Sequence, residues 1–350
     1  MTNTFLLYGS YGYTGNLIAE HAVRAGLRPL LAGRDPARLQ AQAERLGLDF
    51  RVFALSDRSA LEETLRATPP VVHCAGPFVH TWRQMVEACL RTKTNYIDIS
   101  GEIEEFEAVA QLDERAKDAG IMLLPGAGYD VVPSDCLAAH IKRRLPSATH
   151  LKLFIRGVGG GVSRGTARSA IENMQRQGRI RRDGKIITVR PAWKVETRDF
   201  GRGPVKLVSI GWGDVSTAYH STGIPNVEVY MHVPPAAING LKLMRLIGPL
   251  MYNRPVKRLL QSFLRFRPEG PSEAQRERGF SLMLAEASDG ATVVRSKQRV
   301  PEGYHLTMLT AVDIAKRILA GDFKPGFQTP SRAYGPDYIL EFPGVTREDL

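Results

Sequence analysis

The first residues that could do chemistry are three glycines at intervals of three, Gly9, Gly12 and Gly15, in the segment YGSYGYTG. They stand where an apolar run ends and a helical pattern begins. In such a turn Gly9 would permit a tight bend, Gly12 would let a pyrophosphate approach the backbone, and Gly15 would let the helix pack closely on the strand. The helix N-terminus would add free N–H groups and a positive dipole end. The spacing predicts a dinucleotide site; the alternative is a glycine-rich turn without a ligand.

The end of the second apolar run indicates which nicotinamide nucleotide binds. It carries Gly33 and Arg34, with Arg38 one helical turn further on, where an NAD enzyme usually has a carboxylate. A guanidinium at this place can hold a 2′-phosphate in forked geometry, so we expect NADPH. Asp35 is the counter-signal, but because it precedes Pro36 it also suits the role of a helix cap.

Two further segments supply candidates around the nicotinamide. HCAGPF offers small residues to the nicotinamide ribose, of which we expect Ala75, Gly76 and Pro77 to contact the cofactor. Its cysteine, Cys74, is interpreted as a buried structural residue rather than a nucleophile. The segment PGAGYDVVPSD contains Tyr129 and Asp130, a candidate proton donor and a candidate orienting carboxylate.

Some of these polar residues also have a structural interpretation. Asp135 fits the first turn of a helix, where it would complement the dipole. In GGGVSRGT, Ser163 and Thr166 are candidate substrate contacts at a second glycine-rich helix start, although this segment could also be a flexible domain junction.

The elements that must position these residues follow from the pattern of residues 4–127. Apolar runs at 4–9, 28–33, 49–55, 70–76, 95–100 and 121–127 alternate with helical stretches, which predicts an α/β fold with a Rossmann-like, doubly wound parallel sheet. We expect a dinucleotide-binding domain at 1–132, an α+β substrate or interaction domain with an antiparallel sheet at 133–303, and a C-terminal helix and tail at 304–350 that return to the first domain.

In the second domain, helices are predicted near 134–145 and 165–178, and strands at LKLFIRG, VKLVSIG, STAYHS, VEVYMHV, RGFSLMLAEA and ATVVRSKQRV. RIRRDGKIITV predicts a hairpin that turns at Asp183 and Gly184. Residues 234–268 contain seven basic residues and no acidic one. This segment could receive an acyl chain, lie on a lipid surface, or form ordinary amphipathic helices with a solvated basic face.

Composition narrows the class of protein. The formal net charge is +11 and the chain has three cysteines, which favours anionic partners and a reducing, cytoplasmic compartment without a disulfide framework. The N-terminus lacks a signal-peptide layout and no stretch is apolar enough to span a membrane. Aromatic residues do not interleave with basic ones as nucleic-acid binding requires, and we expect no metal.

Together the segments YGSYGYTG, AGRDPARL, HCAGPF, YIDISGE, PGAGYDVVPSD, GGGVSRGTARS and GFQTPSRAYGPDYIL resemble the saccharopine dehydrogenase-like NADP-binding family, most closely its trans-acting enoyl reductase branch. The resemblance runs from residue 4 to about 345. It implies that the cofactor contacts include Gly9, Ser10, Tyr11, Gly12, Tyr13, Thr14, Gly15 and Arg34.

Three functions are compatible with these features. The first is NADPH-dependent reduction of the C=C bond of an acyl thioester, free or bound to an acidic carrier protein. The second is a saccharopine-type C–N oxidoreductase, in which Arg156, Arg164 and Arg168 would clamp substrate carboxylates. The third is an NADPH-binding protein without catalysis that lies on lipid surfaces through 234–268. The oligomeric state does not follow from the sequence.

Overall fold

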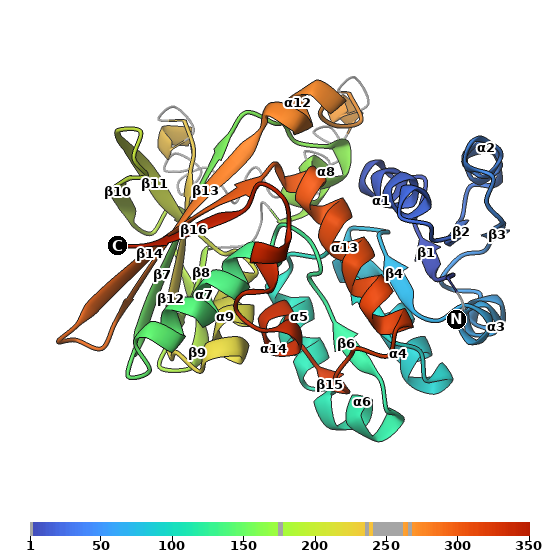
Figure 1. The fold of residues 1–350 in the computed structure, drawn as a ribbon, viewed down its shortest axis with the longest axis horizontal. Helices are drawn as coiled ribbons and strands as arrows, with labels where there is room; N and C mark the ends of the chain where they lie inside the picture. Colours follow the sequence, from blue (N-terminus) through green and yellow to red (C-terminus); the bar gives the residue numbers. More distant parts are fainter. Residues whose placement is uncertain (1–2, 174–177, 235–237, 241–261, 265–267) are drawn as a thin grey trace. The chain divides into compact units, whose positions relative to one another are not determined.

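The computed structural model describes residues 3–173, 178–234, 238–240, 262–264 and 268–350 (Figure 1). The chain forms two compact units. The first comprises Met1–Val132 and Tyr304–Ala333, and the second Pro133–Gly303 and Tyr334–Leu350. Most of the basic segment 234–268, namely 235–237, 241–261 and 265–267, lies outside the described residues. Within the described parts, no helix combines the length and the apolar character needed to cross a membrane.

The first unit contains a parallel sheet, as the alternating pattern predicts. Its seven strands in the described residues have the order β15-β6-β5-β4-β1-β2-β3. Their bounds are β1 Leu6–Tyr8, β2 Leu30–Gly33, β3 Phe50–Val52, β4 Val71–His73, β5 Tyr96–Asp98, β6 Met122–Leu124 and β15 Gly326–Phe327. Because β1 lies between β2 and β4, the chain reverses its direction across the sheet there. Ligands of such sheets bind beyond the carboxyl ends of the strands at this switch point.

The connections between these strands are helical. The helices are α1 Tyr13–Arg24, α2 Pro36–Leu46, α3 Arg58–Ala67, η1 Phe78–His80, α4 Trp82–Thr92, α5 Ile103–Ala110, α6 Asp113–Ala119, α13 Gly303–Leu319 and α14 Pro330–Tyr334. Helix α2 illustrates why they form: the Asp35 carboxylate accepts from the Arg38 backbone N–H at 3.1 Å, Pro36 begins the helix, and Gly47 ends it in the left-handed region. Asp35 is therefore the helix cap that its place before Pro36 indicated.

The second unit contains a nine-stranded mixed sheet within the described part of the chain. Its elements are α7 Val132–Arg144, β7 His150–Val158, α8 Arg164–Asn173, β8 Gly178–Arg182, β9 Lys185–Val189, β10 Val195–Asp199, β11 Pro204–Ile210, α9 Asp214–Thr222, β12 Asn226–His232, α12 Glu273–Arg278, β13 Phe280–Ser288, β14 Val293–Pro301, η3 Tyr338–Glu341 and β16 Thr346–Asp349. The predicted hairpin is present as β8 and β9, with Asp183 and Gly184 at positive φ.

Two details of the second unit differ from the predictions. β12 runs parallel to its neighbour β7, because a long connection separates them and allows either direction. STAYHS is not a strand but lies in α9. There Val215 and Ala218, three positions apart, are both fully buried, and Gly223 ends the helix in the left-handed region.

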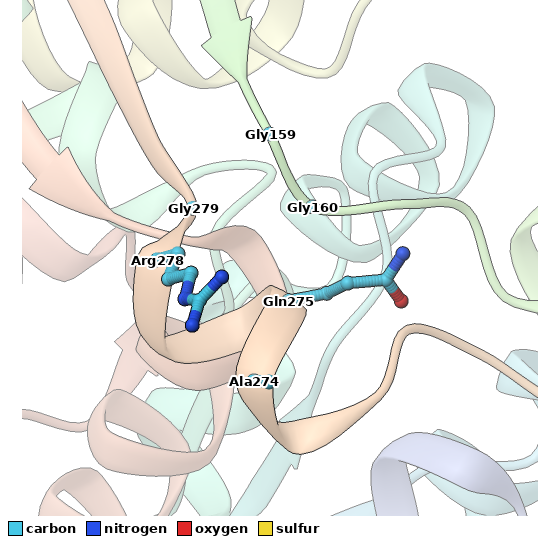
Figure 2. Close-up of a pocket in the computed structure, with 6 residues that line it drawn as sticks. All are labelled: Gly159, Gly160, Ala274, Gln275, Arg278 and Gly279. Atoms are coloured by element: carbon cyan, nitrogen blue, oxygen red, sulfur yellow. The ribbon is translucent and has the colours of Figure 1, made fainter.

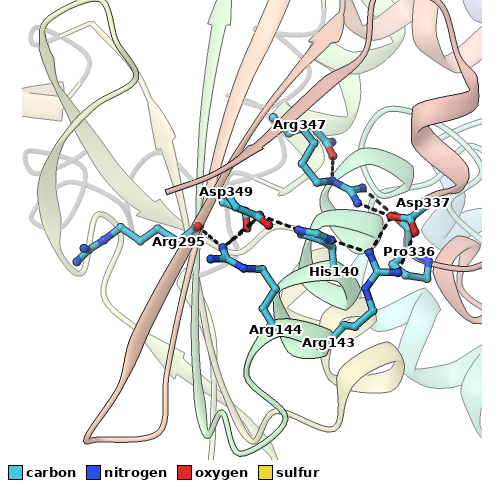
Figure 3. Close-up of polar contacts among 10 residues, drawn as sticks. His140, Arg143, Arg144, Arg295, Pro336, Asp337, Arg347 and Asp349 are labelled. Carbon is cyan, nitrogen blue, oxygen red and sulfur yellow. Dashed lines mark hydrogen bonds and ion pairs between the residues drawn. The ribbon is translucent and has the colours of Figure 1, made fainter.

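The C-terminal tail divides between the units, whereas the sequence analysis placed all of 304–350 with the first domain. Tyr304–Ala333 belongs to the first unit and Tyr334–Leu350 to the second. The last strand, β16, pairs with β14, and the charged side chains around it explain its place (Figure 3). Arg347 donates to Asp337 Oδ1 at 2.8 Å and to Gln298 Oε1 at 3.1 Å, while His140 Nε2 lies 2.8 Å from Asp349 Oδ1.

We predict that Arg347→Ala lowers the free energy of unfolding by about 2–4 kcal/mol, because its side chain is only 5% exposed and its loss leaves the buried Gln298 Oε1 without this donor. Arg143→Ala is the matched control: Arg143 binds the same Asp337, but its side chain is 53% exposed, so about 1 kcal/mol or less is expected. Urea unfolding followed by tryptophan fluorescence measures both. Equal losses in the two variants would contradict the prediction.

Candidate functional site

The glycine turn after β1 is closely packed on both sides. Gly9 has a φ of +80°, and a Cβ there would lie 2.8 Å from the Ala75 backbone nitrogen. A Cβ on Gly15 would lie 2.5 Å from the Gly9 carbonyl oxygen, so only glycine lets α1 begin this close to the turn. At Gly12, among the described residues other than its chain neighbours, such a Cβ would have that same oxygen alone within 4 Å, at 3.3 Å. The helix begins there without a side-chain cap, which suits a phosphate on its N-terminus.

Tyr11 connects this turn to the end of β2. The Arg34 backbone N–H donates to the Tyr11 hydroxyl at 3.2 Å, and Arg38 Nη2 donates to the Tyr11 carbonyl at 2.9 Å. The Arg38 guanidinium also lies over the tyrosine ring, 4.9 Å from its centroid. A Cβ on Gly33 would be 2.4 Å from the ring, so glycine makes room for it. The two exposed arginines, 34 and 38, thus flank Tyr11, where a 2′-phosphate is expected.

The Ser10 side chain hydrogen-bonds to the buried Gln42 of α2. Its hydroxyl donates to Gln42 Oε1 at 2.8 Å, and Gln42 Nε2 donates back to the Ser10 carbonyl at 2.9 Å. Ser10 is fully buried, so a cofactor contact from it remains a prediction for its backbone. Gln42 was not identified from the sequence, because nothing in the pattern of α2 distinguishes it from a surface glutamine.

The loop after β4 begins with two groups that burial keeps neutral. Burial lowers the pKa of His73 to about 3. The Thr81 hydroxyl gives its one proton to the Ala75 carbonyl at 2.8 Å, so His73 Nε2, 3.0 Å away, is the donor to Thr81. Burial also raises the pKa of the Cys74 thiol, which agrees with its interpretation as structural. Neither side chain is therefore suited to proton transfer or nucleophilic attack near neutral pH.

Glu102 connects the loop after β5 to the loop after β4. Its two carboxylate oxygens accept from the backbone N–H groups of Phe78, at 3.2 Å, and Val79, at 2.9 Å. Both N–H groups directly follow Ala75, Gly76 and Pro77, the residues of this segment that are expected to contact the cofactor. Glu102 therefore holds this segment in place, a role the sequence did not reveal because the two segments are more than twenty residues apart along the chain.

Asp98 at the end of β5 connects the loop after β5 to the loop after β6, both of which lie at the carboxyl ends of the strands. Its Oδ1 accepts from the Ser100 and Gly126 backbone N–H groups, both at 2.8 Å, and its Oδ2 from the Tyr96 hydroxyl at 2.5 Å. Glu105 Oε1 lies 3.3 Å from the same hydroxyl. Burial, with the nearby Asp98 charge, raises the pKa of Glu105 well above its usual range, so Glu105 is held in its neutral form.

Asp130 is a carboxyl of this edge whose pKa is raised toward neutral pH. Burial raises its pKa to about 6. A Cβ on Gly101 would lie 2.9 Å from Asp130 Oδ2, so the loops after β5 and β6 meet at this side chain. The neighbouring Tyr129 backbone N–H donates to Thr307 Oγ1 of α13 at 3.0 Å, which fixes the loop from the C-terminal side of the chain. A carboxyl with this pKa can both accept and release a proton.

Ser163 and Thr166 belong to the second unit and face each other. Ser163 Oγ accepts from the Thr166 backbone N–H at 3.1 Å and lies 3.1 Å from its hydroxyl, which caps the first turn of α8. A pocket of about 240 Å³ in this unit is lined instead by two residues of the glycine run and by α12 with the glycine that ends it (Figure 2): Gly159, Gly160, Ala274, Gln275, Arg278 and Gly279. Substrate contact by Ser163 and Thr166 remains a prediction.

Residues 5–124, which span β1 to β6, match the model of the saccharopine dehydrogenase NADP binding domain. The resemblance expected from the motifs is confirmed, and NADP is the cofactor type of this domain. A trans-acting enoyl reductase of Mycobacterium ulcerans is 31% identical over 147 residues, 40% of this chain and 35% of that protein. A human saccharopine dehydrogenase-like oxidoreductase is 24% identical over 211 residues, 53% of this chain and 49% of that protein. The chain thus spans less than half the length of these relatives.

Among solved structures, the apo histidine-tagged saccharopine dehydrogenase (L-Glu forming) of Saccharomyces cerevisiae is similar over 99% of both chains, with a TM-score of 0.66 and 15% identity. This likeness confirms the expected architecture, a Rossmann-like unit with a second unit built on a sheet. It concerns the fold alone.

We predict that Arg34→Ala weakens NADPH binding roughly 10- to 100-fold and leaves NADH binding unchanged, because only NADPH carries the 2′-phosphate that the guanidinium would hold. Titration of both nucleotides by fluorescence or calorimetry measures this. Arg45→Ala is the control: Arg45 lies on α2 like Arg38, but it pairs with Glu20 at 2.7 Å, and both affinities should persist. Equal weakening of NADPH and NADH by Arg34→Ala would disprove the assignment.

Proposed function

We propose that this protein is an NADPH-dependent reductase that acts in trans on the C=C bond of an α,β-unsaturated acyl thioester. The observation that carries the proposal is Asp130, a partly buried carboxyl with a pKa of about 6 in a loop at the carboxyl edge of the NADP-binding sheet. The partial similarity to a trans-acting enoyl reductase supports the choice of substrate.

The chemistry follows from these groups. The glycine turn after β1 and Arg34 would hold NADPH, which would supply a hydride to the β-carbon of the enoyl group. The negative charge that would develop on the thioester oxygen requires hydrogen-bond donors, and the α-carbon would take a proton. Asp130 or Tyr129 would supply that proton. Glu102 and Asp98 would act indirectly, by holding the loops through backbone N–H groups.

The proposal is tested by following NADPH absorbance with a medium-length 2-enoyl thioester and, separately, with saccharopine-type amino acids. We expect oxidation with the thioester only. Turnover with the amino acids alone would replace the proposal by C–N chemistry. Tight NADPH binding without turnover of either the free or a carrier-bound thioester would favour a non-enzymatic role.

The pH dependence tests the role of Asp130. If Asp130 donates the proton, the rate follows its protonated fraction, so it is highest below pH 6 and falls about tenfold per unit well above the pKa. Asp130→Asn should lower kcat by roughly 10²- to 10⁴-fold and abolish this pH dependence. Initial rates between pH 5 and 8 measure both effects. If Asp130→Asn retains the pH profile and Tyr129→Phe loses activity instead, Tyr129 is the donor and the assignment to Asp130 is wrong.

A further inference from the structure

Three neighbouring strands of the second unit place two arginines on one face of its sheet. Arg156 on β7 is directly opposite Leu282 on β13, and Leu282 is directly opposite Arg299 on β14. Directly opposed residues in adjacent strands share a face. Phe280, two residues before Leu282, lies on that same face.

A third arginine, Arg202, also lies beside the Phe280 ring. The Arg202 guanidinium lies 5.1 Å from the ring centroid and that of Arg299 lies 4.5 Å from it, which are cation–π distances. We call Arg156, Arg202, Arg299 and Phe280 the arginine patch. Phe280 in turn packs against an apolar cluster of Phe154, Phe200, Leu207, Tyr230, Leu282 and Leu284. The patch therefore combines positive charge with an apolar base.

The charges of the patch are uncompensated, unlike those around it. Nearby cations of the same sheet pair with carboxylates: Lys152 with Glu196 at 2.7 Å, Lys194 with Glu228 at 2.6 Å, Arg295 with Glu286 at 2.8 Å, and Lys297 with Glu348 at 2.9 Å. Within the described residues the three arginines of the patch have no ion pair. Arg156 Nη1 is buried without an acceptor, and Arg299 donates to the Gly344 carbonyl at 3.3 Å.

An anion would satisfy this arrangement. A buried N–H group without an acceptor costs free energy, which a bound oxygen would recover. Guanidinium groups match the geometry of phosphate and carboxylate oxygens in forked pairs. The half-buried Phe280 and Val205, which pack at the edge of the apolar cluster, suit a ligand whose anionic group continues into an alkyl or amide chain.

We propose that the arginine patch binds the phosphate ester of a phosphopantetheine arm, the group that carries an acyl thioester on coenzyme A or on a carrier protein. This inference rests on the proposed function and deepens it, since it names the chemical group through which the substrate is bound. The three uncompensated charges select the phosphate, and the half-buried Phe280 and Val205 at the edge of the apolar cluster offer apolar contacts to the chain attached to it.

The test is binding of 4′-phosphopantetheine, with pantetheine as the phosphate-free comparison, by calorimetry at saturating NADPH so that the nucleotide site is occupied. We expect the phosphorylated compound to bind at least about tenfold more tightly, with a preference that falls as salt is raised. The Arg202→Ala/Arg299→Ala double variant should lose this preference. Both residues are exposed, so the fold should persist, which circular dichroism checks.

Arg295→Ala is the matched control, since Arg295 is an exposed arginine on β14 like Arg299 but is paired with Glu286. It should keep the preference. Equal binding of the two compounds, or equal loss in the control and the double variant, overturns the proposal. Binding of phosphatidylglycerol but not phosphatidylcholine vesicles that depends on Arg202 and Arg299, without binding of 4′-phosphopantetheine, overturns it in favour of a lipid surface.

A phosphate-free enoyl N-acetylcysteamine thioester separates this inference from the proposed function. Its reduction with NADPH, together with no preference for phosphopantetheine, would retain the reductase and reject the patch. A phosphopantetheine preference that depends on the patch, without turnover of any enoyl thioester, would retain the patch and reject the reductase.

Discussion

The candidate site depends on the Asp98 carboxylate, a single buried acceptor at the end of β5. It accepts from the backbone of the loop after β5 and from the backbone of the loop after β6, in addition to the Tyr96 hydroxyl. These loops contain Gly101 and Asp130, which meet each other. Because an unmade hydrogen bond to a buried N–H group is costly, the two loops cannot separate without losing this acceptor. Their geometry is thus set before any ligand binds.

Residues distant in the sequence complete the same site. Thr310 Oγ1 donates to the Ala127 carbonyl at 2.7 Å, and Thr307 accepts from the Tyr129 backbone, so α13 fixes the loop after β6. A Cβ on Gly128 would lie 2.9 Å from the Thr307 side chain, which makes glycine necessary for this approach. Through these contacts α13 stabilises the edge at which the cofactor is expected.

Features that depend on interactions between residues close in the sequence could be predicted, whereas features that depend on contacts between distant segments could not. The parallel sheet depends on local periodicity and was predicted correctly, whereas the cap at Asp35, which depends on one neighbouring proline, was one of two roles left open for that residue. The parallel β7–β12 pair and the place of β16 depend on contacts between distant segments, which leave no local pattern. STAYHS was expected as a strand, but tertiary burial of Val215 and Ala218, three positions apart, selects the helix. The roles of Glu102 and Asp98 in holding the loops were not predicted, because their partners are backbone N–H groups, which leave no pattern in the sequence.

The acidic residues at the carboxyl ends of the first unit's strands have different roles, which depend on the groups they contact. Asp98 and Glu102 accept from backbone N–H groups, so removing either disturbs the loops as well as the charge. Glu105 is held neutral by burial and by Asp98, and its proton is not available near neutral pH. Asp130 differs, because burial brings its pKa to about 6, within the range in which enzymes exchange protons. A loss of activity on removing Asp98 or Glu102 would therefore report on loop geometry, whereas a changed pH profile would report on Asp130.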